Sequence, residues 1–411
     1  MAEKERSGNK NLKYVKLYEW ITACIYNGEI RYGEKLPSEA MLCKKFEISR
    51  QTVRTAMDFL EKDGFVRRVQ GSGTFVAYDM LGKGKNQKTV GLLISYFTKY
   101  LFPHVFSGIE SELSKSNIGI DIAVTYNQIN VETMFLERML HSNVSGIIIE
   151  GTKSAFPNPN TNLYNALQQR GIPIIFFHNH YSNFNFSAVE MSDEQCVYLL
   201  TKKLIENGHK RIAGIFKFDD LQGVERYKGF LRCMANNRLK IDDQCVKWYS
   251  TEDFENSFSR KSLNAFLKKI SDCTAIVVYN DEIAVEMLNF FKSKGIRVPD
   301  DISMVSVDDT DLLRMSNIHI VSAVHPKKEL GRKVAENMVK MINDKNWRYK
   351  DYSYKFPPEI SDGDSIKDIR NEVKLAKAKQ ILGGEYENLE QRKGLSRDRS
   401  RLDSYKGGAY Q

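Results

Sequence analysis

The stretch from residue 36 to residue 76 is the most informative part of this 411-residue chain. It reads LPSE at 36–39, SRQTVR at 49–54 and GSGTFV at 71–76. Ser38 and Ser49 each stand where a helix N-cap is expected, because a serine hydroxyl can accept a hydrogen bond from a free amide in the first helical turn. The glycines of the third motif favour a tight turn between two short strands. This order predicts two helices followed by a β-hairpin.

The residues around these motifs predict a small helical domain with one exposed reading helix. Apolar side chains recur at helical spacing between residues 14 and 25, and again at positions 53, 56, 57 and 60. Gln51 and Arg54 then point away from the second apolar face, and Arg50 lies at its border. Two helices joined by a short turn, with Arg and Gln on the first turn of the second, match the helix-turn-helix geometry that enters the DNA major groove. The hairpin, with strands at 65–69 and 74–76, forms a wing that reaches the adjacent minor groove.

Each of these side chains has a chemical reason to contact DNA. Arginine can pair with guanine and glutamine with adenine, while serine and threonine hydroxyls and a helix N-terminus can bind phosphate. The candidate DNA-binding residues are Ser38, Glu39, Ser49, Arg50, Gln51, Thr52, Arg54, Gln70 and Gly71. Charge alone favours the alternative of a small domain with a solvated basic face, because the excess of positive charge in this region is modest.

The three motifs in this order resemble the GntR family of bacterial winged-helix regulators. The signatures that carry the resemblance are LPSE, SRxTVR and GxGTFV. The resemblance implies that the segment binds double-stranded DNA. Ala40 departs from the pattern, since many family members place a DNA-contacting arginine there, and no contact is expected from it.

The overall composition limits the class of protein. A net charge of +9 suits an anionic partner, and no apolar run is long enough to span a membrane. The polar residues 1–11 do not read as a signal peptide, so we expect a cytoplasmic protein. The six cysteines form no CxxC pair, which predicts reduced thiols and neither a zinc site nor any other metal or cofactor.

From Thr89 onward the pattern changes to short apolar runs separated by helical segments. Such alternation is typical of parallel sheets covered by helices on both faces, and the length favours two lobes. The predicted helices include 105–114, 131–141, 196–207 and 283–294. The apolar runs are 90–95, 118–124, 146–149, 172–177, 212–216, 275–278 and 302–307.

Polar residues follow these runs, and ligands bind parallel sheets at the carboxyl ends of the strands. The set is Tyr96, Glu150, Lys153, His178, Lys217, Asn280, Asp281, Asp308 and Asp309. Carboxylates and amides mixed with aromatic rings suit a neutral sugar, whereas a phosphorylated ligand requires more Arg and Lys. Each Asp or Asn could instead be only a helix cap and His178 a surface histidine, but their convergence favours a binding site.

Residues 89 to about 345 resemble the effector domain of the LacI/GalR regulators, which is itself similar to periplasmic sugar-binding proteins. The matching pieces are GHKRIA at 208–213, RYKGF at 226–230, TAI at 274–276, ND at 280–281, VPDDIS at 298–303, DD at 308–309 and LG at 330–331. The resemblance implies that Arg226, Asn280 and Asp308 contact the effector. The full set of candidate effector-binding residues is Tyr96, Glu150, Lys153, Gln222, Arg226, Asn280, Asp308 and His325.

A GntR-type head on a LacI-type body resembles the arabinose-responsive repressors of Gram-positive bacteria. The strings IEGTKSAFPNPN at 149–160 and GIFKFDDLQGV at 214–224 fit that group. The resemblance implies a homodimer that binds a palindromic operator and is released by L-arabinose. A different pentose or hexose, or a sugar phosphate, is the main alternative. A sugar-acting enzyme lacks support, since no P-loop, GxSxG, HExxH or strand-linked GxGxxG occurs, and a transport protein would carry an export signal and no DNA-reading head.

The expected fold is therefore α/β, with an N-terminal winged helix-turn-helix followed by a two-lobe, periplasmic-binding-protein-like domain of parallel sheets flanked by helices. The expected boundaries are 1–80 for the DNA-binding domain, 81–88 for a linker and 89–360 for the effector-binding and dimerisation domain. The linker lacks the hinge-helix pattern of LacI proteins. Residues 361–411 read as a polar, disordered tail with one helix possible at 366–382.

Overall fold

The computed structural model describes residues 5–26, 28–69, 73–77, 88–97, 101–314 and 318–371. Gln70, Gly71 and nearly all of the predicted linker lie outside the described residues, as does most of the helix predicted at 366–382. In the described part of the chain, no helix combines the length and the apolar character that a membrane span requires.

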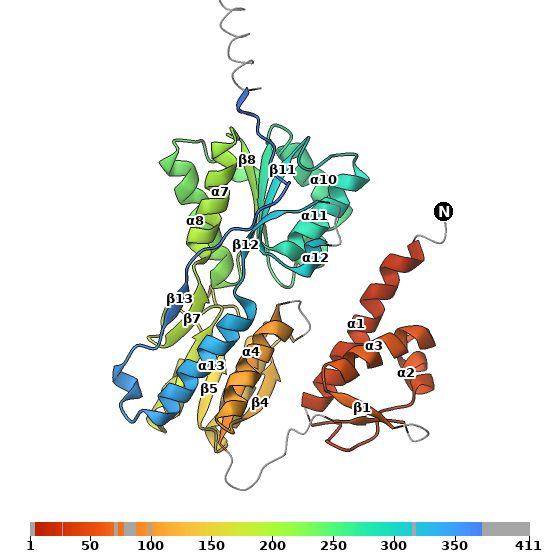
Figure 1. The fold of residues 1–411 in the computed structure, drawn as a ribbon, viewed down its shortest axis with the longest axis vertical. Helices are drawn as coiled ribbons and strands as arrows, with labels where there is room; N and C mark the ends of the chain where they lie inside the picture. Colours follow the sequence, from red (N-terminus) through yellow and green to blue (C-terminus); the bar gives the residue numbers. More distant parts are fainter. Residues whose placement is uncertain are drawn as a thin grey trace, which may run out of the picture.

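The head is a winged helical domain (Figure 1). Helix α1 (Glu5–Tyr26) packs against α3 (Arg50–Lys62), and α2 (Glu39–Phe46) packs against α3 as well. Strands β1 (Val66–Val69) and β2 (Gly73–Val76) pair in antiparallel fashion to form the predicted wing. The core is built from side chains at the predicted helical spacing, with Leu17, Ile21, Val53 and Leu60 fully buried.

The first lobe is a parallel sheet of six strands among the described residues, in the order β13-β7-β6-β5-β3-β4. Helix α13 packs against α4 and against the strands β5, β6 and β7. The strands are β3 (Thr89–Ile94), β4 (Gly119–Val124), β5 (Gly146–Ile149), β6 (Ile174–Phe177), β7 (Ser187–Met191) and β13 (Tyr354–Phe356). The helices are α4 (Phe102–Lys115), α5 (Ile129–His141), α6 (Thr161–Gln169) and α13 (Lys327–Asn343).

The second lobe is a parallel sheet with the order β12-β11-β10-β8-β9. Helices α7 and α8 pack on each other, and α7 also contacts β10, β11 and β12. The strands are β8 (Ile212–Lys217), β9 (Val246–Tyr249), β10 (Ala275–Val278), β11 (Ser303–Asp308) and β12 (Val321–Val324). The helices are α7 (Asp193–Glu206), α8 (Leu221–Asn236), α9 (Phe254–Ser257), α10 (Arg260–Lys269), α11 (Asp281–Ser293) and α12 (Asp311–Arg314).

The described chain passes between the lobes at three places. It leaves the first lobe after β7, returns after β12, and leaves again after β13 toward Ile360, which pairs with Ala323 of β12. Crossings of this kind allow two lobes to hinge about a cleft. Because both sheets are parallel, the carboxyl ends of their strands supply the residues that face this cleft.

All seven predicted apolar runs correspond to strands, which are β3, β4, β5, β6, β8, β10 and β11. The strands β7, β9, β12 and β13 were not predicted. They are short and contain polar residues such as Glu190, Lys247 and Ser322, so they show no apolar run. Neighbouring strands hold them in place through backbone pairing.

The prediction of a disordered tail from residue 361 was wrong for residues 361–371. Ser361 N–H donates to Ser322 O at 2.8 Å and Met304 N–H donates to Ser365 O at 2.9 Å. The Ser365 hydroxyl is fully buried and donates to Met304 O. The segment contains few apolar residues, yet its hydrogen bonds and the packing of Ile366 and Ile369 attach it to the second lobe. Residues 372–411 lie outside the described residues.

Candidate effector cleft and DNA-reading surface

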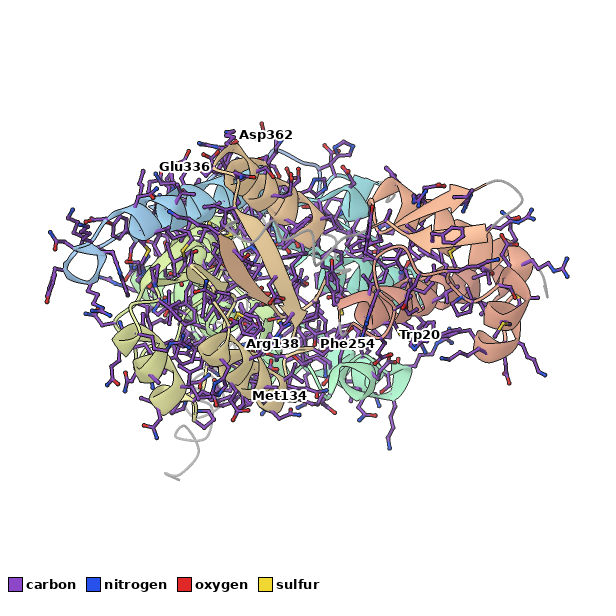
Figure 2. The ribbon with its side chains drawn as sticks, turned by 90° about the horizontal axis from the view of Figure 1, so that it is seen from below. Trp20, Met134, Arg138, Phe254, Glu336 and Asp362 are labelled. Atoms are coloured by element: carbon purple, nitrogen blue, oxygen red, sulfur yellow. The ribbon has the colours of Figure 1, made fainter. Side chains whose placement is uncertain are left out.

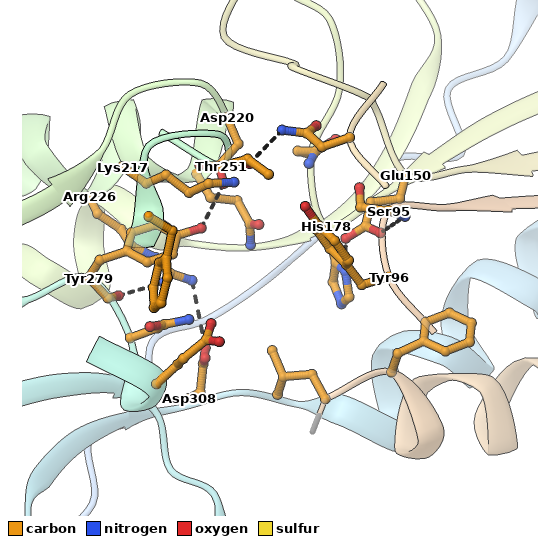
Figure 3. A pocket seen from close by; sticks show the side chains of 18 of the residues that line it. Ser95, Tyr96, Glu150, His178, Lys217, Asp220, Arg226, Thr251, Tyr279 and Asp308 are labelled. Atoms are coloured by element: carbon orange, nitrogen blue, oxygen red, sulfur yellow. Dashed lines mark hydrogen bonds and ion pairs between the residues drawn. The ribbon is translucent and has the colours of Figure 1, made fainter. Parts of the chain in front are cut away.

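A cavity of about 350 Å³ lies between the two lobes (Figure 3). Its volume falls within the range of small-molecule binding sites. Of the eight residues predicted to bind the effector, the structure brings seven together on its walls: Tyr96, Glu150, Gln222, Arg226, Asn280, Asp308 and His325. Lys153 does not line the cavity.

Glu150 is the central polar group on the first-lobe wall. It follows β5 and accepts hydrogen bonds from Ser95 N–H at 2.7 Å and from His178 Nδ1 at 3.0 Å. Burial alone would raise the pKa of Glu150, but the hydrogen bonds from His178 and Ser95 outweigh burial and leave the pKa below its ordinary value. Glu150 is therefore a charged acceptor at neutral pH.

Two histidine rings meet beside Glu150. The ring centroids of His178 and His325 lie 5.0 Å apart, and the rings are nearly perpendicular at 80°. Burial, followed by the nearby His178, holds the pKa of His325 well below its ordinary value, so the ring is neutral. Nε2 of His178 and both ring nitrogens of His325 are buried without a hydrogen-bond partner among the described residues. Buried polar atoms usually have partners, so these nitrogens are available to the hydroxyls of a ligand.

Arg226 organises the second-lobe wall. Its Nε donates to Asp193 Oδ1 at 2.7 Å, one terminal nitrogen donates to Tyr279 O at 2.7 Å, and the guanidinium lies 4.6 Å from the centroid of the Tyr279 ring. Burial alone would lower the pKa of Arg226, but the Asp193 carboxylate keeps it well above its usual range. The guanidinium also lies 3.8 Å from Asp308 Oδ1. Two of its nitrogens thus donate to protein acceptors, and a third lies near the Asp308 carboxylate.

Asp308 has an unusual backbone conformation. Its φ is +115°, and the next residue, Asp309, has φ +47°, both in a region that non-glycine residues rarely adopt. Lys327 Nζ donates to the carbonyl oxygens of Asp308 and Asp309, at 2.7 and 2.8 Å. Strained backbone of this kind persists only where the surroundings impose it, and it is concentrated at functional sites.

A third polar group on the wall joins Lys217 and Asp220. Lys217 Nζ lies 2.9 Å from Asp220 and 3.4 Å from Asp219, and the Tyr279 hydroxyl donates to Asp220 at 2.9 Å. Burial alone would lower the pKa of Lys217, but the Asp220 and Asp219 carboxylates raise it above its ordinary value. Lys217 is therefore protonated, and the carboxylates of Asp220 and Asp219 compensate its positive charge.

The cavity is acidic overall. The acidic residues that line it are Glu150, Asp220, Glu255, Glu282 and Asp308, and the basic ones are Lys217 and Arg226. Because both cations have carboxylate partners, the wall offers no surplus positive charge to an anionic ligand.

Several polar contacts join the two lobes at the cleft. Asn127 Nδ2 donates to Asp219 Oδ2 and to Thr251 Oγ1, both at 2.8 Å. Ser154 Oγ accepts from Leu221 N–H at 2.9 Å. Lys153 belongs to this group, because its ammonium pairs with Glu252 of the second lobe. The structure thus places Lys153 across the lobes and not on the cavity wall.

Several residues that line the cavity were not predicted, including Asn127, Asp220, Tyr249, Thr251 and Phe254. Asn127 and Asp220 follow predicted strands and could have been found by the same rule. Tyr249 and Thr251 lie at the end of β9, which had not been predicted. His178, for which a surface loop was the alternative, is buried.

Two predicted residues have roles in capping and packing. Asn280 lines the cavity and also caps α11, accepting from Ile283 N–H at 3.1 Å. Asp281 is fully buried and accepts hydrogen bonds from Ser306 Oγ and from Thr310 N–H, both at 2.7 Å. The helix-cap interpretation was therefore partly right for this pair.

On the head, the exposed first turn of α3 presents Arg50, Gln51 and Arg54. Arg54 pairs with Glu39 at 3.3 Å. Ser38 and Ser49 cap α2 and α3, accepting from Met41 N–H and Thr52 N–H. Thr52, for which a phosphate contact was predicted, is buried, and its hydroxyl lies 2.8 Å from Ser49 Oγ.

Two parts of the chain match known protein families. Residues 13–76 match the bacterial regulatory proteins of the gntR family, and residues 201–366 match the periplasmic binding protein-like domain. The transcription regulator CcpA of Lactococcus lactis has a similar fold, with a TM-score of 0.59 at 22% identity over 69% of this chain and 100% of that chain. These matches confirm the predicted fold class.

Two relatives are similar over most of their length. The chain is 36% identical over 360 residues to the arabinose metabolism transcriptional repressor of Geobacillus stearothermophilus, covering 87% of this chain and 98% of that protein. It is 35% identical over 336 residues to the repressor of the same name from Halalkalibacterium halodurans, covering 80% and 89%. These relatives are repressors and not enzymes. The chain therefore belongs to the family of arabinose metabolism transcriptional repressors.

Proposed function

We propose that this sugar-responsive repressor binds a palindromic operator as a homodimer and is released when L-arabinose binds between the lobes of its effector domain. The observation that carries the proposal is the interlobe cavity, which holds charged acceptors, neutral histidine nitrogens and aromatic rings on walls from both lobes. The arabinose metabolism repressors among its relatives support L-arabinose as the sugar.

The charge of the cavity supports a neutral sugar over a sugar phosphate. Glu150 and Asp220 have lowered pKa values, Glu150 through His178 and Asp220 through Lys217, both against the opposing effect of burial. Ionised carboxylates accept hydrogen bonds from hydroxyls and repel phosphate. Lys217 and Arg226 are already paired with carboxylates. Tyr96, Phe102, Tyr249 and Tyr279 add ring faces that can cover the C–H surface of a pyranose.

The release step follows from two-state linkage. A ligand that contacts both lobes favours the arrangement in which both walls reach it. In a symmetric dimer, the distance between the two recognition helices must match the spacing of the operator half-sites. A change of lobe arrangement that moves the heads therefore weakens operator binding.

The proposal is tested by fluorescence anisotropy of a labelled fragment of an arabinose-operon promoter. The purified protein is titrated onto the fragment, and L-arabinose, D-xylose, D-galactose and a pentose phosphate are then added separately. Release by L-arabinose alone supports the proposal. Tight binding that L-arabinose leaves unchanged would overturn the effector assignment, and release by the phosphate would select the alternative ligand class.

A further inference from the structure

We propose that the DNA-binding head is docked on the first lobe through Phe97, and that this contact couples the effector cavity to the head. The proposal rests on the proposed function only for the identity of the ligand. Figures 1 and 2 both show the head beside the first lobe, and Figure 2 marks Trp20 on the head. Helix α1 of the head contacts β4 of that lobe.

Phe97 follows β3 and is enclosed by rings from both domains. Its ring centroid lies 5.3 Å from Tyr26 at the end of α1 and 5.1 Å from Phe65 at the start of the wing. On the lobe side it lies 5.2 Å from Phe102 and 6.0 Å from Phe106, both on α4. Only 7% of its surface is exposed. Aromatic rings at these distances attract each other beyond the area that they bury.

The same segment forms part of the cavity wall. Ser95, Tyr96, Leu101 and Phe102 line the cavity. Phe102 therefore contacts Phe97 while lining the cavity, and Tyr96 precedes Phe97 directly in the chain. Because close-packed interiors transmit small displacements, a ligand that moves Tyr96 or Phe102 must also change the packing around Phe97.

A second route leads from the cavity wall toward β4, the strand that α1 contacts. The ring of Tyr96 lies 6.2 Å from that of Tyr126, which follows β4 and has φ +50°. Burial, followed by the charge of Glu19 on α1, raises the pKa of Tyr126. Both routes begin at cavity-wall residues that follow β3, namely Phe102 and Tyr96.

Docking leaves the DNA-reading side chains uncovered. The contacts use Tyr26 and Phe65, whereas Arg50, Gln51 and Arg54 remain exposed on α3. Docking can therefore fix the orientation of the reading helix without blocking it. In a dimer, the first lobe would then set the separation of the two heads.

The test compares the full-length wild type with Phe97→Ala. We expect Phe97→Ala to bind the sugar normally and to bind operator DNA, but to reduce the sugar-induced change in operator affinity from the 5- to 150-fold that is typical of allosteric proteins to under about 3-fold. Calorimetry measures sugar affinity and anisotropy measures operator affinity with and without sugar. Unchanged sugar-dependent release in Phe97→Ala would overturn the proposal.

Phe184→Ala is the matched control, since Phe184 packs in an aromatic cluster with Tyr164 and Tyr181 of the same lobe, away from the head. The Phe184→Ala variant should retain the wild-type change in operator affinity when sugar binds. Tyr26→Ala removes the contact from the head side, and it should reproduce the phenotype of Phe97→Ala. Combining Tyr26→Ala with Phe97→Ala should cause no greater loss of the sugar response than either change alone, because both remove the same contact. Additive losses would contradict a shared contact.

Hydrogen exchange separates failure of this proposal from failure of the proposed function. Without any ligand, Phe97→Ala should increase exchange at the end of α1 and around Phe65, while the core of the second lobe stays protected. If the wild type ignores L-arabinose but this increase is seen, docking stands and the effector assignment fails. If hydrogen exchange does not increase in Phe97→Ala, the docking proposal is overturned, regardless of the effect of L-arabinose on operator binding.

Discussion

At the scale of single residues, the cavity wall contains two kinds of polar group. Several of its charged side chains are hydrogen-bonded or ion-paired within the protein, whereas some of its histidine nitrogens have no hydrogen-bond partner among the described residues. Glu150, Asp220 and Arg226 each have partners within the protein, which fixes their charge and direction. His325 is the exception, because it is buried and neutral with no partner for either ring nitrogen among the described residues. The paired charged groups therefore stabilise the cavity wall, whereas the nitrogens of His325 can form hydrogen bonds with a ligand.

His325 should make stability depend on pH. Its pKa in the folded protein is lowered by burial and by His178, whereas in the unfolded chain it is about 6.5. Below about pH 6.5 the unfolded chain therefore binds the extra proton, and stability falls by up to about 1.4 kcal/mol per pH unit. The melting temperature of the wild type should drop more steeply from pH 7 to 5.5 than that of His325→Gln. His104→Gln, at an exposed position on α4, should keep the wild-type slope, and identical slopes in all three proteins would count against this role.

Asp308 should matter for the sugar and not for DNA. Replacing it by Asn keeps its shape but removes the charge beside Arg226. Loss of a buried charged acceptor costs about 2–3 kcal/mol, so sugar binding measured by calorimetry should weaken about 30- to 160-fold. Operator affinity without sugar should be unchanged. Asp311→Asn, at an exposed site on α12, is the control, and loss of both activities in Asp308→Asn would point to a folding defect.

At the scale of elements, α3 shows how a local pattern produces a reading surface. Its apolar positions face the head core, Ser49 caps its start, and its first turn is exposed. Arg68 of the wing pairs with Asp58 of α3 at 2.6 Å, which links hairpin and helix into one unit. The unit therefore presents a fixed surface to the grooves of DNA.

Arg54→Ala should weaken operator binding by about 1–3 kcal/mol if Arg54 reads a base. Its pair with Glu39 is exposed, so the melting temperature should change little. Anisotropy with the promoter fragment and with a scrambled fragment distinguishes the cases. If Arg54 contacts a base, Arg54→Ala should lower the affinity for the promoter fragment only. An equal loss of affinity for both fragments would indicate that Arg54 contacts a phosphate instead. Arg232→Ala, on α8, removes the same charge from the body and should leave operator binding unchanged.

At the scale of the whole molecule, one chain joins three structural units, and the contacts between them define the states available to it. Asn127, Lys153 and Ser154 join the lobes across the cleft. Tyr26, Phe65 and Phe97 join the head to the first lobe. A ligand in the cleft therefore acts on residues that lie next to both sets of contacts.

Linkage between the sites must be reciprocal. If L-arabinose weakens operator binding by some factor, saturating operator must weaken L-arabinose binding by the same factor. Calorimetric titration of the sugar into the protein, with and without operator, measures this directly. A scrambled duplex is the control and should have no effect. Equal sugar affinity in the presence and absence of operator would exclude the release mechanism.

Features of this protein that depend on local chemistry could be predicted from its amino-acid sequence. Helical spacing, two serine caps and a glycine turn predicted the head, because each acts within a few residues. Apolar runs predicted seven strands for the same reason. The resemblance to known regulators supplied Arg226, Asn280 and Asp308, which the structure brings to one cavity.

Contacts between residues far apart in the chain could not be predicted and depend on the folded arrangement. Asn127 and Thr251 are 124 positions apart and bond across the cleft, and Lys153 spans the lobes there instead of lining the cavity. The polar segment 361–371 is ordered by hydrogen bonds to β12 and to Met304, and Phe97 packs between head and lobe. No local pattern encodes such contacts, because they depend on how the sheets stack and where the chain crosses between lobes.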